Sequence, residues 1–292
     1  MSLDYIAAQL FNGLASGAYY ALLALGLSII FGTLRIINFA HGAIYMLGAF
    51  GAYYGAALLG LPFFAALIVI PIAAGLFGML LEWLVLRRVT GSDPIYGLLL
   101  TFAITLVIVN VMTLLAGSLG SPYTMPSALS GATNLGFTIF PTYKLFVIGI
   151  SLAVCALTWW FVERSLVGAR IRAATEDPVL ARAFGINTPR LVMLTFGFGV
   201  AIAALAGVLA APTTNVLPTM GDDLVIYTFA IVVIGGLGSI TGSIVAGFIL
   251  GLLQTVGAVY YPPIATTLIF IVMVAIIWLR PAGLFGRPEA TR

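Results

Sequence analysis

Long apolar stretches alternate with short polar or turn-rich links along the whole chain. A helix that crosses a bilayer needs about 20 apolar residues, and the links divide the chain into roughly eight to ten stretches of that order, with nine the favoured count. The segments are Tyr5–Phe31, Ala40–Leu59, Phe63–Leu86, Pro94–Ala116, Leu145–Phe161, Leu191–Ala211, Leu224–Ile234, Ser243–Tyr260 and Ile264–Leu279. The pattern predicts an all-α polytopic membrane protein, built as a helical bundle.

The seventh segment is short and is followed directly by Gly235-Gly236-Leu237-Gly238-Ser239. Irregular backbone survives inside a membrane only where it is buried in protein or lines a cavity. We therefore expect a broken or re-entrant piece here.

Composition agrees with a bilayer environment, because 62% of the residues are apolar and only 7% are charged. Too little polar surface remains to coat a water-soluble globule. The formal net charge of +3 is small. It does not indicate nucleic-acid binding, since basic residues of membrane proteins gather in cytoplasmic loops.

The distribution of basic residues predicts the orientation. With an external N-terminus and nine crossings, eleven of the twelve basic residues fall on the cytoplasmic side and only Lys144 falls outside. The eleven are Arg35, Arg87, Arg88, Arg164, Arg170, Arg172, Arg182, Arg190, Arg280, Arg287 and Arg292. This asymmetry predicts a cytoplasmic C-terminus.

Two loops are longer than the others in this single predicted transmembrane domain of residues 1–292. The external loop, about 117–143, is rich in Gly, Ser, Pro and Thr, and it is either an ordered cap, a docking surface or a passive cover. The internal loop, about 162–190, holds five of the basic residues and several helix start and stop signals.

Four pairs of glycines at four-residue spacing let helices approach closely. The pairs are Gly13/Gly17, Gly51/Gly55, Gly238/Gly242 and Gly247/Gly251. In a chain with 33 glycines we favour packing within the molecule over a dimer seam.

The segments are almost free of ionisable side chains, which disfavours proton-coupled transport. Glu82, near the cytoplasmic end of the third segment, is most simply a snorkelling or arginine-paired residue. The lone Cys155 excludes an intrachain disulfide and a cysteine-rich metal site, and we expect it to pack in the core.

Catalytic motifs are also missing. The only lysine lies in Pro141-Thr142-Tyr143-Lys144, so the sequence contains no G-x-x-x-x-G-K-[ST] phosphate-binding loop. A Ser-His pair would have to use the one histidine, His41, at a predicted membrane boundary. We therefore expect no enzyme and no cofactor in this chain, and any ATP-driven cycle must use ATP and Mg²⁺ on another polypeptide.

The internal loop contains the signals of one complete short helix. Asp177 is the predicted N-cap, Pro178 takes the first helical position and Gly185 ends the helix. Thr188-Pro189 repeats the cap-then-proline pattern and opens the next membrane helix. The short helix should therefore lie on the cytoplasmic face, separate from both neighbouring crossings.

This helix is predicted to be amphipathic. Val179, Leu180, Ala183 and Phe184 recur at helical spacing and form an apolar face, with polar residues at its edges. Such a face suits either a groove in a partner protein or the lipid headgroups, to which the nearby arginines would also bind. The sequence physics leaves both interpretations open.

Several segments resemble the branched-chain amino acid ABC transporter permeases of the LivH type. They are Phe31-Gly32-Thr33-Leu34-Arg35-Ile36-Ile37-Asn38-Phe39-Ala40-His41-Gly42, Ala173-Ala174-Thr175-Glu176-Asp177-Pro178, Ala183-Phe184-Gly185-Ile186-Asn187 and Gly235-Gly236-Leu237-Gly238-Ser239. The resemblance covers essentially the whole chain.

The resemblance implies a permease that pairs with a second, related permease, two cytoplasmic ATPase subunits and an external solute-binding protein. The helix from Asp177 to Phe184 would then be the coupling helix that inserts into the ATPase. In that role Leu180 and Phe184 anchor the helix, while Glu176 and Arg182 make polar contacts at the rim.

The stretch from Asn38 to Gly42 has a sufficient structural explanation. Asn38 can cap the second helix, His41 can form a hydrogen bond near the interface, and Gly42 permits close packing. A gate or solute path that includes these residues, together with Gly235 and Gly236, is the alternative.

Asp222 and Asp223 fall on the external face in this topology. They are either solvated loop carboxylates or a docking point for basic residues of the binding protein. The resemblance leaves the solute among branched-chain amino acids, other amino acids, urea and short amides. The alternative function is an ATP-independent channel or facilitator for a small polar solute.

Overall fold

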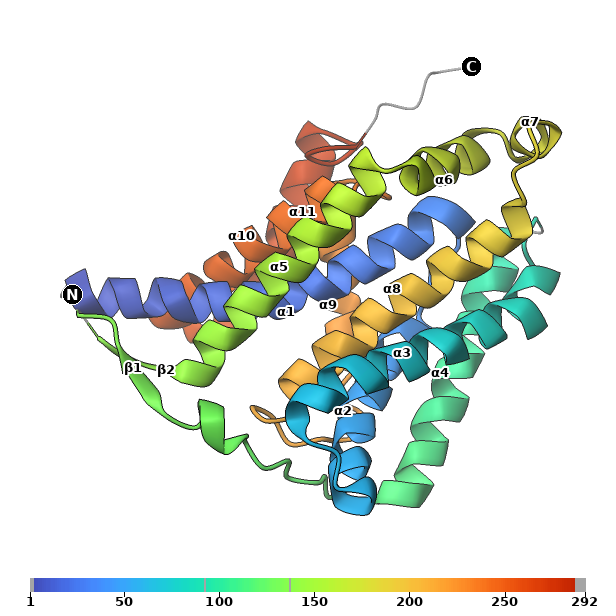
Figure 1. Cartoon of the computed structure of the whole chain (residues 1–292). Helices are drawn as coiled ribbons and strands as arrows, with labels where there is room; N and C mark the ends of the chain where they lie inside the picture. The colour runs from blue at the N-terminus through green and yellow to red at the C-terminus, as the bar shows by residue number, and fades with distance from the viewer. Residues whose placement is uncertain (1–2, 92, 137, 287–292) are drawn as a thin grey trace. The chain divides into compact units, whose positions relative to one another are not determined.

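The computed structural model describes residues 3–91, 93–136 and 138–286 (Figure 1). The helices are α1 (Leu3–Leu34), α2 (Ala40–Leu59), α3 (Phe63–Leu84), α4 (Pro94–Ala116), α5 (Thr142–Arg164), α6 (Leu166–Glu176), α7 (Pro178–Ala183), α8 (Thr188–Ala210), α9 (Asp222–Gly235), α10 (Ile240–Tyr260) and α11 (Thr267–Leu279). Three single 3-10 turns, η1 (Leu86–Arg88), η2 (Ser127–Leu129) and η3 (Pro262–Ile264), lie between them.

Seven helices in the described ranges are long and apolar enough to cross a membrane: α1 to α5, α8 and α10. Each of the nine predicted segments corresponds to one helix, but α9 has 14 residues and α11 has 13, fewer than a full crossing needs. The all-α polytopic membrane class is confirmed. The nine crossings, the placement of the termini and the single-domain organisation stay predictions.

The chain divides into two units. Unit 1 contains the chain up to Leu25, Thr124–Leu157 and the chain from Tyr227 onward, and unit 2 contains Gly26–Tyr123 and Thr158–Ile226.

Unit 2 is organised around α8, which packs against both α2 and α3 (Figure 1). Glycines permit this approach, because a Cβ at Gly207 would overlap the carbonyl oxygen of Tyr45, and a Cβ at Gly48 would overlap that of Ala204. Close contact between small residues is the usual way in which membrane helices associate. The core of unit 2 therefore lies along the α2–α8 contact.

Unit 1 contains the contact between the first part of α1 and α10. The backbone of Gly251 lies against Gly17, and that of Gly247 against Ala21. These contacts confirm that the glycine pairs on both helices serve packing within the molecule. Tyr20 on α1 also donates a hydrogen bond to Gln254 on α10.

The predicted external loop is more ordered than its composition indicates. Within unit 1 it contains a hairpin of β1 (Ala132–Asn134) and β2 (Ile139–Pro141), antiparallel, with Thr133 opposite Phe140. The apolar pattern did not predict strands of three residues.

Candidate functional site at the α6–α8 loop

Helix α7 has the ends that the sequence predicts. One carboxylate oxygen of Asp177 accepts hydrogen bonds from the backbone N–H of Val179 and of Leu180, both at 2.9 Å. At the other end, Gly185 adopts a φ of 81° and donates its N–H to the carbonyl of Arg182. The cap, the proline and the left-handed glycine confine α7 to six residues, which confirms the predicted short helix.

The apolar side chains of α7 point away from the rest of the chain. Val179 is 72% exposed, Leu180 54% and Phe184 78%, whereas Ala181 is 4% exposed and supplies the inward contact. The sequence pattern missed Ala181, since a single small residue gives no periodic signal. Large apolar side chains this exposed on a loop rich in charged residues form a surface of the kind that contacts another protein or a membrane.

The polar residues at the rim have different surroundings. Arg182 donates its Nε–H to the carbonyl of Pro178 at 3.0 Å, so part of its guanidinium is used within α7. Glu176 is exposed and belongs to the end of α6 rather than to α7. Their predicted contacts with a partner stay predictions.

Helix α6 precedes α7 and was not predicted. Ser165 caps it by accepting a hydrogen bond from the N–H of Gly168, and Arg172 ties it back to α5 through the carbonyl of Val162 at 2.6 Å. Ser165, a typical N-cap residue, was the available sequence signal. The helix has only 11 residues and few apolar ones, so it did not stand out among the long apolar segments. The loop therefore presents α7 on an ordered support rather than on a flexible link.

The start of α8 differs by one residue from the prediction. Asn187, not Thr188, is the N-cap, and its side-chain oxygen accepts a hydrogen bond from the N–H of Arg190. Thr188 is buried as the first helical residue. Asparagine is the stronger N-cap residue of the two, which agrees with this arrangement.

Asn38 and His41 are both buried in unit 2, each 1% exposed. Asn38 accepts a hydrogen bond from the N–H of Ala40, although the formal N-cap of α2 is Phe39. Asn38 therefore caps α2 as predicted, but it does so from the position before the N-cap residue. The residues before α2 are also joined to α4, because Thr101 donates to the carbonyl of Ile37.

Gly42 lies where the sequence analysis expected close packing. A Cβ on this residue would overlap the carbonyl oxygen of Gly221, the residue before α9. Gly42 thus holds the beginning of α2 against the turn before α9. Its role in a gate stays a prediction.

Gly235 and Gly236 belong to unit 1 and end α9. Leu284 and Phe285 donate their N–H groups to the carbonyls of Ile234 and Gly235, so the chain after α11 covers this helix end. Gly236 has a φ of 105° and faces the backbone of Gly286. Close backbone packing explains these glycines, and a place in the solute path stays a prediction.

Asp222 and Asp223 are exposed in the first turn of α9. Partial burial, and then the charge of Asp223, raise the pKa of Asp222 above its ordinary value. A basic group on another protein would stabilise both carboxylates.

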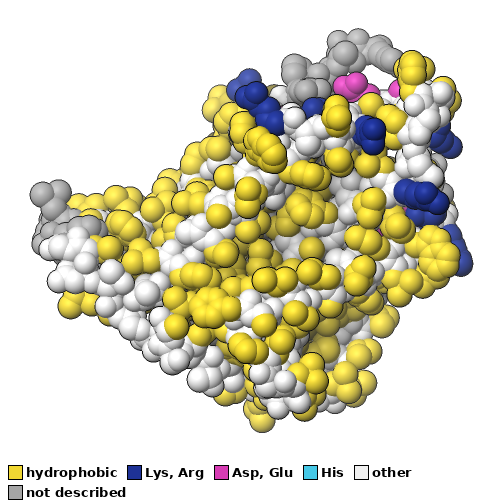
Figure 2. Space-filling model, in the orientation of Figure 1, with side chains coloured by type: hydrophobic (Ala, Val, Ile, Leu, Met, Phe, Trp, Pro, Cys, Tyr) yellow, Lys and Arg dark blue, Asp and Glu magenta, His cyan; other side chains and the backbone are white. Residues whose placement is uncertain are grey.

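Basic residues gather on the face of unit 2 that carries α6 and α7. Figure 2 shows dark-blue side chains along this margin with magenta acidic side chains among them, whereas most of the remaining visible surface is hydrophobic or uncharged. Glu176 and Asp177 lie exposed directly before α7 and Arg182 lies on it, so its apolar side chains have charges of both signs beside them.

Comparison with known proteins gives one consistent answer. The family model described as "Branched-chain amino acid transport system / permease component" matches residues 9–277. The chain is 32% identical to the high-affinity branched-chain amino acid transport system permease protein LivH of Salmonella typhimurium, over 99% of this chain and 98% of that protein. It is 24% identical to the permease protein LivM of Escherichia coli K12, over 79% of this chain and 59% of that protein.

Among solved structures, the chain is similar to PsaBC from Streptococcus pneumoniae in complex with Fab. The TM-score is 0.48 at 14% identity, over 92% of this chain and 89% of that one.

Proposed function

The chain belongs to the branched-chain amino acid transport permease family, and we propose that it forms half of the solute path of an ABC importer for branched-chain or related amino acids. The protein is a multi-pass protein of the bacterial inner membrane. The single observation that carries the proposal of coupling is the exposed apolar surface of α7, formed by Val179, Leu180 and Phe184.

The energy source is a separate subunit. The sequence has no phosphate-binding loop, and the capped helix α7 is a rigid element through which a movement of another protein can be transmitted. Two cytoplasmic ATPase subunits, which bind ATP and Mg²⁺, would each receive one coupling helix. Leu180 and Phe184 anchor α7 in the ATPase groove, and Glu176 and Arg182 contact its rim.

The second permease is a related but different chain. LivH and LivM are two permease proteins whose names assign them to a high-affinity branched-chain amino acid transport system, and this chain is similar to both. A heteromeric pair is therefore favoured over a homodimer. Asp222 and Asp223 supply an acidic docking point for an external solute-binding protein, with the N-terminus outside and the C-terminus in the cytoplasm.

The transport cycle is alternating access. A loaded binding protein docks outside, ATP closes the ATPase dimer, and α7 converts that closure into a movement of unit 2. The residues around Asn38, His41 and Gly42 take part in the gate because they join the start of α2 to α4 and to the turn before α9.

Introduction of a negative charge into the apolar surface of α7 tests this function. Leu180→Asp and Phe184→Asp should abolish ATP-driven uptake in proteoliposomes that contain the whole complex, while the amount inserted in the membrane stays unchanged. Phe184→Leu, which keeps an apolar side chain, should retain most uptake. Leu59→Asp is the control for an acid at another exposed leucine, 80% exposed at the end of α2, and should also transport.

Normal uptake by both α7 variants would remove the coupling role. Solute flux through the purified chain alone, down a gradient and without ATPase subunits, would establish the facilitator in its place.

A further inference from the structure

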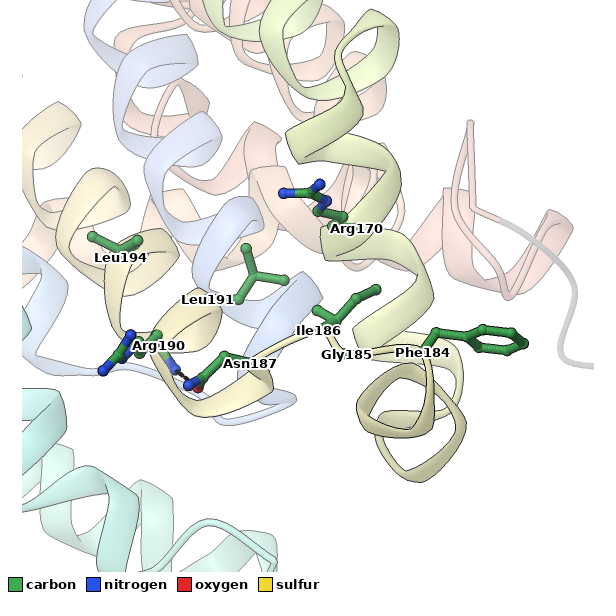
Figure 3. Close-up of a pocket in the computed structure, with 8 residues that line it drawn as sticks. All are labelled: Arg170, Phe184, Gly185, Ile186, Asn187, Arg190, Leu191 and Leu194. Carbon is green, nitrogen blue, oxygen red and sulfur yellow. Dashed lines mark hydrogen bonds between the residues drawn. The ribbon is translucent and has the colours of Figure 1, made fainter.

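A hollow lies beside α7, between α6 and the start of α8 (Figure 3). Its volume is about 320 Å³. Its walls include Ile186, Leu191 and Leu194, and it has Arg170 and Arg190 at its edges. The end of α7, at Phe184, also lines it. The hollow combines an apolar interior with two positive charges, and the proposed coupling role uses neither arginine.

The two guanidiniums have no anionic partner within residues 3–91, 93–136 and 138–286. The ion pairs found there use Arg87 and Arg172 instead. Figure 3 shows the guanidinium of Arg170 directed from α6 toward α8, with Leu191 between it and Arg190. Two unpaired arginines on either side of an apolar side chain present two separate positions for phosphate or carboxylate groups.

The position of the hollow indicates where the anion comes from. Helix α8 is one of the seven candidate spans and begins at Thr188, so Arg190 lies in its first turn, at the level of the lipid headgroups. Leu194, one turn further along, is 51% exposed, and Leu166 at the start of α6 is 79% exposed. An acyl chain can cover these leucines, which a soluble anion cannot do.

We propose that this hollow binds an anionic phospholipid of the cytoplasmic leaflet, with a headgroup that carries two phosphates, as in cardiolipin. One phosphate binds Arg170 and the other binds Arg190, and the acyl chains follow Leu191 and Leu194. Such a lipid joins α6 to α8 and thereby fixes the segment that presents α7. The proposal requires only that the chain lies in a membrane, and it holds whether or not α7 couples to an ATPase.

Lipid titration of the purified full-length chain tests the site. After exchange into neutral detergent, native mass spectrometry should show cardiolipin retained more strongly than phosphatidylglycerol, and both more strongly than phosphatidylcholine. Cardiolipin should also raise the midpoint of thermal unfolding, whereas inorganic phosphate or pyrophosphate at the same concentration should not.

The double variant Arg170→Gln/Arg190→Gln should bind cardiolipin roughly thirtyfold more weakly, because each arginine near an anionic lipid contributes about 1 kcal/mol and a tenfold change is about 1.4 kcal/mol. The matched control is Arg35→Gln/Arg88→Gln. It removes the same charge from two exposed arginines of unit 2 that do not line the hollow. The control should bind cardiolipin as the unchanged chain does.

Several results would overturn the proposal. An equal loss in the control variant would show general charge attraction, and equal retention of phosphatidylcholine would show an apolar contact without headgroup recognition. Protection by free pyrophosphate would assign the hollow to a soluble anion. Unchanged lipid binding with weaker recovery of ATPase subunits from membranes would make the hollow part of a protein interface.

The variant Arg170→Lys/Arg190→Lys keeps the charge and guards against misfolding of the glutamine variant. It should retain most cardiolipin binding. If the lysine variant is well folded and binds no more cardiolipin than phosphatidylcholine, the site is disproved.

Discussion

Arg87 donates two hydrogen bonds to the carboxylate of Glu82, from Nε at 3.3 Å and from Nη2 at 2.9 Å. The two residues are five apart, a spacing that does not bring side chains together on a straight helix. They meet because α3 ends at Leu84 and the chain continues as the 3-10 turn η1. Nη2 also donates to the carbonyl of Pro189 at 3.3 Å, so the pair connects the end of α3 to the start of α8. The interpretation of Glu82 as an arginine-paired residue is thereby confirmed.

Removal of Arg87 should therefore destabilise the protein. The carboxylate of Glu82 is 2% exposed, and Arg87→Met would leave it buried without its cation. Breaking a buried pair costs about 3 to 5 kcal/mol, and we expect the lower end because Arg87 is 35% exposed. The measurement is the free energy of unfolding in detergent. The double variant Glu82→Leu/Arg87→Met should recover most of the loss, and equal losses in the single and double variants would contradict the pairing.

Two glycines give a matched test of helix packing. Gly207→Ala places a methyl group on the carbonyl oxygen of Tyr45 and should cost about 3 kcal/mol, since both partners are backbone and neither helix can yield. Gly149→Ala, on α5, meets no atom within 4 Å and should stabilise the protein by about 0.5 to 1 kcal/mol through helix propensity. Thermal unfolding of both variants measures the difference. Similar midpoints would mean that α2 and α8 are not in close contact.

The cap of α7 should matter for coupling more than for stability. Asp177→Ala removes the acceptor for two N–H groups and costs the helix about 1 kcal/mol. Because α7 is short and exposed, unfolding of the whole protein should change little, while hydrogen exchange at Val179 and Leu180 accelerates and ATP-driven uptake falls. Asp177→Asn keeps a capping oxygen and should retain both protection and uptake. Loss of uptake in Asp177→Asn would instead assign the function to the charge.

The pH dependence of stability should reveal the raised pKa of Asp222. Its pKa is raised by partial burial and by the charge of Asp223, so the folded protein holds this proton more tightly than the unfolded chain does. The resulting stabilisation is complete below the ordinary value of 3.8 and is lost as the pH rises through the raised pKa. Asp222→Asn should therefore raise the unfolding midpoint of the isolated chain at pH 7 relative to its parent.

The same substitution should weaken docking of the external binding protein, because a basic partner needs the carboxylate. Asp223→Asn should also stabilise the isolated chain, since it removes the second cause of the raised pKa. A lower midpoint for Asp222→Asn at pH 7 would contradict both arguments.

The sequence by itself determined the nine apolar segments, the ends of α7 and the absence of a nucleotide-binding loop. Apolar length, an aspartate before a proline and a glycine that adopts a positive φ act within a few residues, so their consequences can be derived without the fold. The short α6 and the three-residue strands escaped because their signals are weak at that length.

Only the tertiary structure decided which segments meet. Tyr45 approaches Gly207 across more than a hundred residues, and Arg170 and Arg190 come to share one hollow through the path of the chain between them. Hydrophobicity does not select which helices pack together in a membrane, because the lipid tails are as apolar as the neighbouring helices. Packing of small residues and placement of polar groups select the partner, and these depend on the three-dimensional positions of distant residues.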